Sequence, residues 1–172
     1  MDQMVSTGMS SRVRRMAYAC LAIACLAATP APAIGQDDSA GTAKDVILAR
    51  KTLMNSIMDK MDWITEMISQ GTIDLDKVHA LADDIAVMLT AFPHLFPPNS
   101  NQWKENADID PATDTVASPD IWIDFADFYR RSAAAAKTAD DLRRADSEDE
   151  VKRLNRALGV ACDTCHSLYL KE

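Results

Sequence analysis

Three residues near the end of the chain, Cys162, Cys165 and His166, have a spacing that suits the attachment of haem. The string Cys-x-x-Cys-His is the attachment signature of c-type haem. Each thiol adds to one vinyl group of the porphyrin, and the histidine ligates the iron. Positions i, i+3 and i+4 share one face of a helix, so all three side chains would face one planar group. The sequence therefore predicts one covalently attached haem c, with His166 as proximal iron ligand.

Zinc binding and dithiol redox chemistry are the other common roles of a Cys-x-x-Cys pair. A structural zinc site takes four ligands. Besides the two cysteines, the only Cys or His residues after residue 33 are His79, His94 and His166, so zinc would need two of these histidines. We interpret His79 and His94 as surface or capping residues. A redox dithiol of the thioredoxin type is expected beside a βαβ pattern, which the chain lacks. Haem attachment accounts for both cysteines and the adjacent histidine, while a helical interaction protein with an incidental motif is the alternative without haem.

The first 33 residues have the pattern of a secretory signal peptide. Three arginines precede an apolar run over residues 16–28, and a small-residue cleavage site ends at Ala33. The apolar run is shorter than the roughly 20 residues of a membrane span. We therefore expect residues 34–172 to form a periplasmic domain, with two of the four cysteines removed. A lipid-modified Cys25 and an uncleaved anchor are the weaker alternatives.

The exported part of the chain is predicted to be acidic and to form one domain. Removal of three arginines and Asp2 leaves 15 basic and 25 acidic residues, which changes the net charge from −8 to −10. A chain of this size suits one hydrophobic core. The negative charge argues against binding to nucleic acids or anionic membranes, and it permits a basic partner protein.

Four helical stretches can be read from the apolar periodicity, and no strand alternation is visible. They cover about residues 42–70, 74–91, 118–145 and 147–170. A connection over residues 92–118, with four prolines, separates the second from the third. The predicted fold is an all-α, antiparallel four-helix bundle with a long loop between helices 2 and 3.

Local signals mark where these helices begin. Thr42 with Asp45, and Ser147 with Glu150, have the spacing of capping boxes. Ser118 stands where an N-cap belongs, followed by a proline at the first helical position. The aromatic residues of the third stretch are predicted to lie in the core, and these include Trp122, Phe125 and Tyr129.

These features together resemble the class II cytochromes c, the family of cytochrome c prime and its low-spin relatives. In that family the haem motif ends the last helix of an exported four-helix bundle. Arg50-x-x-x-Met54 is similar to the family's Arg-x-x-x-Met or Arg-x-x-x-Leu pattern, and residues 118–122 match another recurring stretch. Residues 95–97 look more like the low-spin, methionine-ligated members. The resemblance covers essentially the whole exported part.

The resemblance implies roles for two residues of the first helix. Met54 would face the sixth coordination position of the iron and serve as the distal axial ligand, as in the low-spin relatives. In cytochrome c prime the equivalent side chain only covers that face. Arg50, one turn earlier, is a candidate contact of a haem propionate, because a buried guanidinium requires an anionic partner. The alternative for Arg50 is a side chain that reaches solvent at the edge of the bundle.

The implied function is a periplasmic electron carrier with His/Met-ligated, low-spin haem. Its partners would be redox proteins, including ones with basic docking surfaces, and the chain would be a monomer or a homodimer. The alternative is a high-spin, five-coordinate protein that binds a small gas such as nitric oxide. No nucleophile–base pair or carboxylate pair suggests catalysis, so the chain is not predicted to be an enzyme.

Overall fold

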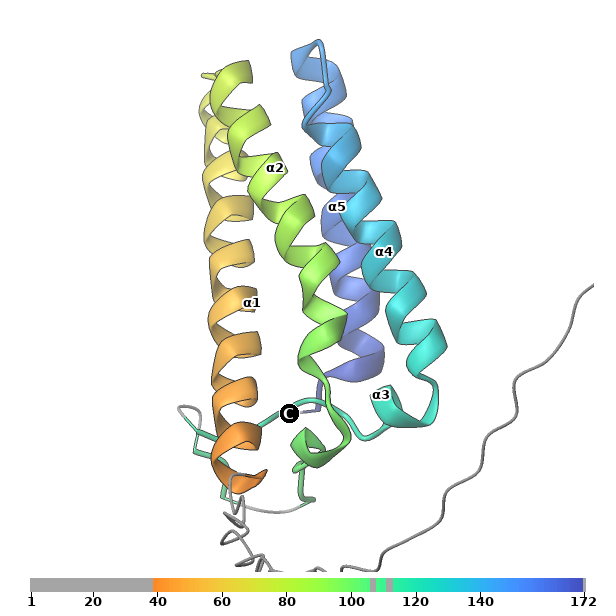
Figure 1. The fold of residues 1–172 in the computed structure, drawn as a ribbon. Coiled ribbons are helices and arrows are strands. Elements are labelled where there is room, and N and C mark those ends of the chain that lie inside the picture. The colour runs from red at the N-terminus through yellow and green to blue at the C-terminus, as the bar shows by residue number, and fades with distance from the viewer. Residues whose placement is uncertain (1–38, 106–107, 111–112, 172) are drawn as a thin grey trace, which may run out of the picture. The chain divides into compact units, whose positions relative to one another are not determined.

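The computed structural model describes residues 39–105, 108–110 and 113–171, and these form a bundle of helices (Figure 1). The helices are α1 (Ser39–Gln70), α2 (Leu75–Ala91), α3 (Asp120–Ile123), α4 (Phe125–Leu142) and α5 (Glu148–Tyr169). Two 3₁₀ turns, η1 (Phe92–Leu95) and η2 (Pro98–Ser100), lie in the connection between α2 and α3. The described ranges contain no β-strand, which confirms the predicted all-α four-helix bundle. The expected signal peptide lies outside the described residues.

The pair α1 and α2 is joined by a short turn at Gly71. Gly71 has a φ of 66°, a left-handed conformation that glycine adopts without steric cost, and it ends α1 as predicted. Asp74 then caps α2, since its carboxylate accepts a hydrogen bond from the Lys77 amide at 3.2 Å. The predicted start of α1 was wrong, because the helix begins at Ser39 and Thr42 lies inside it.

The third predicted helix is broken into two pieces at Asp124. The backbone of Asp124 leaves the helical region, with φ −127° and ψ 65°, and its side chain accepts from the Asp127 amide at 3.0 Å. This bond caps α4, so the prediction of one continuous helix over residues 118–145 was wrong. The Ser118 hydroxyl accepts from the Asp120 amide at 3.1 Å, but the N-cap position of α3 is Pro119, one residue later than predicted.

Helix α5 begins at the predicted capping signal and carries the cysteine–histidine motif in its last two turns. The Ser147 hydroxyl accepts from the Glu150 amide at 3.4 Å. The Glu150 carboxylate accepts in return from the amide of Asp146, one residue before the position of an ideal capping box. The last turn of α5 closes with the Leu170 amide bonded to the His166 carbonyl at 2.9 Å.

Aliphatic side chains fill the body of the bundle, and aromatic side chains fill one end. The largest apolar cluster draws on α1, α2, α4 and α5 and includes Ile64, Val78, Ile85, Leu142 and Leu158. A second cluster consists of Phe96, Ile121, Phe128 and Tyr169. Each fully buried side chain of this size contributes roughly 1.5–3 kcal/mol of transfer free energy to folding.

The predicted aromatic core was only partly right. Phe125 and Tyr129 are 39% and 41% exposed, so they lie at the surface and not in the core. The buried face of α4 instead follows Phe128, Ser132, Ala135 and Ala139. Trp122 is half-buried, and its indole N–H donates to the Phe96 carbonyl at 3.1 Å.

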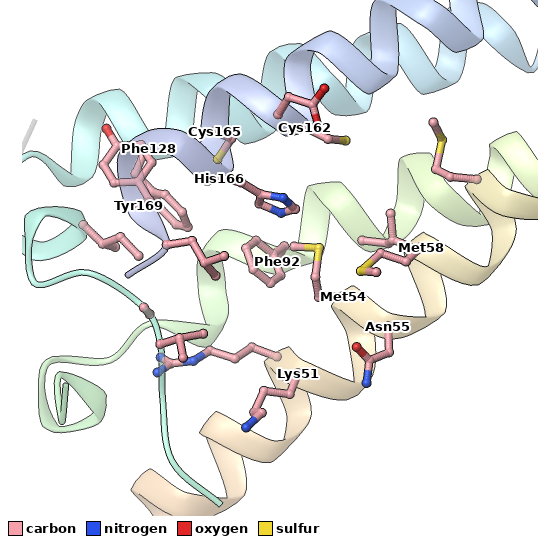
Figure 2. Close-up of a pocket in the computed structure, with 18 of the residues that line it drawn as sticks. Lys51, Met54, Asn55, Met58, Phe92, Phe128, Cys162, Cys165, His166 and Tyr169 are labelled. Atoms are coloured by element: carbon pink, nitrogen blue, oxygen red, sulfur yellow. The ribbon is translucent and has the colours of Figure 1, made fainter. Parts of the chain in front are cut away.

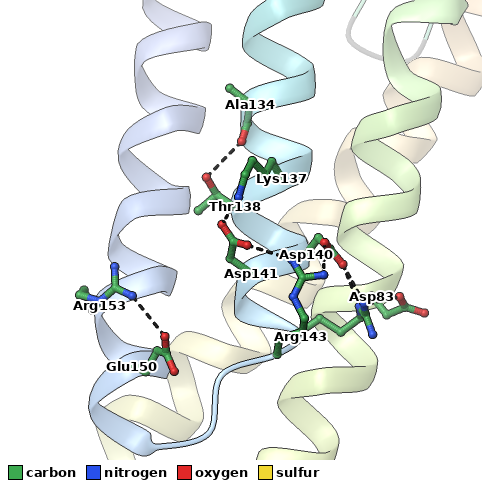
Figure 3. Close-up of polar contacts among 10 residues, drawn as sticks. Asp83, Ala134, Lys137, Thr138, Asp140, Asp141, Arg143, Glu150 and Arg153 are labelled. Atoms are coloured by element: carbon green, nitrogen blue, oxygen red, sulfur yellow. Dashed lines mark hydrogen bonds and ion pairs between the residues drawn. The ribbon is translucent and has the colours of Figure 1, made fainter.

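Ion pairs tie the end of α4 to α2 on the bundle's surface (Figure 3). Arg143, the residue after α4, contacts Asp140 of α4 at 2.9 Å and Asp83 of α2 at 3.3 Å. Lys137 and Asp141 form a further pair at 2.7 Å along α4. Exposed pairs of this kind contribute little each, so the apolar interior holds the bundle together.

Candidate functional site

A cavity of about 640 Å³ lies between α1 and α5 beside the aromatic end of the bundle. Its volume is within the roughly 300–1,000 Å³ that is usual for cofactor and ligand sites. Helix α5 contributes Cys162, Cys165 and His166 to its wall, and α1 contributes Met54 and Met58 (Figure 2). The structure thus brings the predicted haem-attachment residues and the predicted distal ligand to one cavity.

The two cysteines of the motif form no disulfide with each other and are partly buried in the cavity wall. Burial raises the pKa of the Cys165 thiol to about 11. Burial, with the nearby Asp163 carboxylate, also raises the pKa of Cys162. Burial thus favours the neutral form of both sulfur groups at this wall of the cavity. A thioether carries no ionisable proton, so conversion of these thiols to thioethers suits the apolar surroundings.

A metal site built from protein ligands alone is not found in the part of the chain that the structure describes. No three His, Cys, Asp or Glu side chains of these residues gather closely enough to hold a metal ion. His79 bonds the Ala145 carbonyl at 2.8 Å, and the exposed His94 lies edge-on to the Tyr129 ring. Neither histidine lines the cavity, so the zinc alternative is not supported.

Met54 and His166 approach the cavity from opposite helices. Figure 2 shows the Met54 thioether and the His166 imidazole projecting into the same space, Met54 from α1 and His166 from α5. Met54 is half-buried, whereas Met58, one turn further on, is 51% exposed. The donor set of one imidazole, one thioether and two thiols around an apolar cavity fits a haem c.

Arg50 is buried in the wall of this cavity, with 4% of its surface exposed. Its guanidinium donates to the Ser100 hydroxyl at 3.1 Å, to the Ser100 carbonyl at 3.4 Å and to the Thr115 hydroxyl. It also lies over the Phe96 ring, 4.7 Å from the centroid. The alternative that Arg50 reaches solvent at the bundle's edge is therefore wrong.

The charge of Arg50 has no counter-ion among the described residues. All its hydrogen-bond acceptors are neutral oxygens. Burial lowers the pKa of Arg50 to about 10, so the guanidinium is still protonated at neutral pH. A buried cation with neutral partners only is unfavourable, and the cavity beside it is the place where an anionic group could pair with it.

Tyr169 links the haem-motif end of α5 to α4. Its phenol donates to the Asp127 carboxylate at 2.7 Å, and Arg131 donates to the same oxygen at 2.5 Å. Burial and the bond to Asp127 raise the pKa of Tyr169 to about 12. The bond from Arg131 holds the pKa of Asp127 below its usual value. Sequence reasoning missed Tyr169 and Asp127. Tyr169 lies one turn after His166, and this spacing could have pointed to it.

Residues 115–118, which we call the closing segment, pair with the end of α5 and contribute to the cavity wall. The Ser118 amide donates to the Tyr169 carbonyl, and the Lys171 amide donates to the Val116 carbonyl, each at 2.8 Å. Sequence reasoning also missed Ser100 and Thr115 at this end of the cavity. No motif marks them, and only the fold brings them to Arg50.

A family model described as Cytochrome C' matches residues 45–169. The chain belongs to the cytochrome c' family, the class II cytochromes c. The family's members carry covalently attached haem c, and the chain is accordingly a mono-haem c-type cytochrome. Family members are periplasmic proteins that act as electron carriers or gas binders. Among the residues described, no helix is both long and apolar enough to cross a bilayer.

Curated relatives include proteins called cytochrome c-556. One from Agrobacterium tumefaciens (strain II Chrys) is 30% identical over 124 residues, which cover 70% of this chain and 92% of the relative. One from Agrobacterium fabrum is 30% identical over 124 residues, covering 70% of this chain and 77% of the relative.

Solved structures with the same fold include several cytochromes c'. The protein from Thermochromatium tepidum aligns with a TM-score of 0.66 at 21% identity, covering 76% of this chain and 97% of that one. A nitric oxide complex of a mutant protein from Alcaligenes xylosoxidans aligns with a TM-score of 0.63 at 17% identity, with the same coverage. These matches confirm the bundle fold.

Proposed function

We propose that this member of the cytochrome c' family is a periplasmic electron-transfer protein with a low-spin haem ligated by His166 and Met54. The observation that carries the proposal is the placement of the Met54 thioether and the His166 imidazole on opposite walls of one cavity. The relatives named cytochrome c-556 support an assignment within this family.

The residues of the chain divide the work of holding the cofactor. Cys162 and Cys165 would form the two thioether bonds and so keep the group attached outside the cytoplasm. His166 would ligate the iron from α5, and Met54 from α1. When bound, haem c supplies a one-electron Fe(III)/Fe(II) couple. Because a thioether is a soft ligand that favours the ferrous state, Met54 would raise the reduction potential.

Arg50 would pair with a haem propionate in the cavity. Its buried charge has neutral acceptors only, and an Arg–carboxylate pair is favourable and can be bidentate. The Arg50 guanidinium would thus help to orient the group in the cavity, and the exposed Met58 also lines this cavity.

The proposed function also requires export of the protein and docking with a redox partner. We propose that residues 1–33 are a signal peptide cleaved after Ala33, and that the acidic remainder docks with basic redox proteins as a monomer or homodimer. N-terminal sequencing of the exported protein tests the cleavage site. The residues at the cavity point to binding and electron exchange, so we do not assign an enzymatic reaction.

The alternative function, gas binding by a five-coordinate iron, differs by one bond. In that case Met54 would pack over the iron without ligating it and would give way to a small ligand. Absorption spectra and carbon monoxide binding separate the two, because a ligating methionine must dissociate before carbon monoxide can bind.

The test compares two methionines of the same helix that both line the cavity. Met54→Leu keeps the volume nearly constant and removes the sulfur, and Met61→Leu is the matched control. We expect Met54→Leu to give a five-coordinate ferrous protein that binds carbon monoxide rapidly, and Met61→Leu to retain the wild-type spectrum. An unchanged spectrum in Met54→Leu would rule out Met54 as the ligand.

A further inference from the structure

Hydrogen bonds around Arg50 connect α1 to the chain segments that close the cavity. Arg50 lies one helical turn before Met54 and bonds Ser100 of η2 and Thr115 of the closing segment. With 4% of its surface exposed and its guanidinium against the Phe96 ring, the side chain has little freedom to choose other partners.

Thr115 is the link between Arg50 and the remainder of the closing segment. Its hydroxyl oxygen accepts from the Arg50 guanidinium and also from the Ala117 amide at 3.1 Å. Thr115 is itself 5% exposed, so water cannot readily replace either bond. The next residues are bonded to α5, since the Ser118 amide donates to the Tyr169 carbonyl at 2.8 Å.

A series of bonded groups therefore runs from α1, one turn before Met54, to α5, one turn after His166. It passes through Arg50, Thr115, the closing segment and Tyr169. The two helices lie on opposite sides of the cavity at this level, so the series fixes the position of one wall relative to the other.

We propose that Thr115 is a positioning residue for the distal ligand: through Arg50 it sets where α1 holds the Met54 sulfur relative to His166. The inference rests on the proposed His/Met ligation. Without the Thr115 hydroxyl, one guanidinium N–H is left unpaired in a buried place. Arg50 then no longer ties α1 to the closing segment, and the turn of α1 that carries Met54 can shift relative to α5. A displacement of a fraction of an ångström weakens the bond between the sulfur and the iron.

The experiment uses the haem-loaded protein and the isosteric variant Thr115→Val. Thr115→Ser restores the hydroxyl, and Thr90→Val is the control, because the exposed Thr90 hydroxyl bonds only the Ala86 carbonyl of its own helix at 2.8 Å. We measure carbon monoxide binding to the reduced protein and the reduction potential. The cost of an unpaired buried donor is enough to change the equilibrium between iron-bound and dissociated Met54 about tenfold.

Thr115→Val should therefore bind carbon monoxide about tenfold faster than wild type and have a lower reduction potential. Thr115→Ser and Thr90→Val should stay within about twofold of wild type. A Thr115→Val protein that behaves as wild type overturns the positioning role while the proposed function stands. A Thr115→Ser protein that behaves as Thr115→Val also overturns it, because the hydroxyl would not be the responsible group.

Two further outcomes are distinguishable. Rapid carbon monoxide binding by wild type would overturn the proposed His/Met ligation, and the positioning role with it. If Thr115→Val does not assemble with haem, Ser100→Ala takes its place, since it removes one acceptor of the same guanidinium and leaves Thr115 intact. Faster carbon monoxide binding in Ser100→Ala supports positioning through Arg50, and wild-type behaviour overturns it.

Discussion

Replacement of Arg50 by methionine tests whether its buried charge pairs with a carboxylate of the bound cofactor. Methionine retains much of the apolar volume and removes the guanidinium. In the described structure the acceptors of Arg50 are neutral, and each hydroxyl has a second bond. The Ser100 hydroxyl also donates to the Pro97 carbonyl at 2.8 Å, and the Thr115 oxygen also accepts from the Ala117 amide at 3.1 Å.

The loss of stability in Arg50→Met differs between an arginine with neutral partners only and one paired with a propionate. If Arg50 has neutral partners only, its removal leaves few groups unpaired and also removes a buried charge, so the net cost is about 0–1 kcal/mol. If Arg50 pairs with a propionate, its removal leaves a partly buried carboxylate without its cation. Breaking such a pair costs about 3–5 kcal/mol. We expect the larger value.

The assay is urea unfolding of the haem-loaded protein followed by circular dichroism of the helices. With a slope of about 1–3 kcal/mol per molar urea, the expected loss lowers the midpoint by at least about 1 M. Arg156→Met is the control, because Arg156 is exposed on α5 and such substitutions change stability by about 0.5 kcal/mol or less. A loss below about 1 kcal/mol in Arg50→Met would refute the pairing.

Two further predictions concern the aromatic end of the bundle. Phe128 is 2% exposed and lies 4.7 Å from the Phe96 ring centroid, so Phe128→Ala should cost about 3–5 kcal/mol in thermal or urea unfolding, and a loss below about 1 kcal/mol would contradict this packing. The pKa of Tyr169 is raised from 10.0 to about 12, so its contribution to stability should be complete below pH 10 and decline as the pH rises to about 12. Tyr169→Phe should lack this decline in unfolding midpoints measured across that range, and an identical pH dependence in both proteins would contradict the bond to Asp127.

The helix ends that sequence predicted correctly are those set by local chemistry. Ser147 caps α5, and Gly71 ends α1, because a hydroxyl or a missing Cβ acts within a few residues of the chain. The break at Asp124 was missed, since an aspartate followed by Phe-Ala-Asp is also compatible with a continuous helix. Contacts between distant segments accompany the break, including the bond from the Trp122 indole to the Phe96 carbonyl.

The residues of the candidate site also divide into those that local sequence predicts and those that only the tertiary fold brings together. Cys162, Cys165 and His166 follow from spacing alone, because they lie on one face of one helix. Met54 came from a family resemblance, and the structure adds that it lines the same cavity. Thr115 is 65 residues from its partner Arg50, and Asp127 is 42 residues from its partner Tyr169. Pairings over such distances are determined by the tertiary fold, and no local pattern predicts them.

The most direct test of the central claim is the absorption spectrum of the purified, reduced wild-type protein before and after addition of carbon monoxide. Ligation by His166 and Met54 predicts a six-coordinate, low-spin spectrum that changes only slowly when carbon monoxide is added. A five-coordinate, high-spin spectrum that converts at once to a carbon monoxide complex would contradict it.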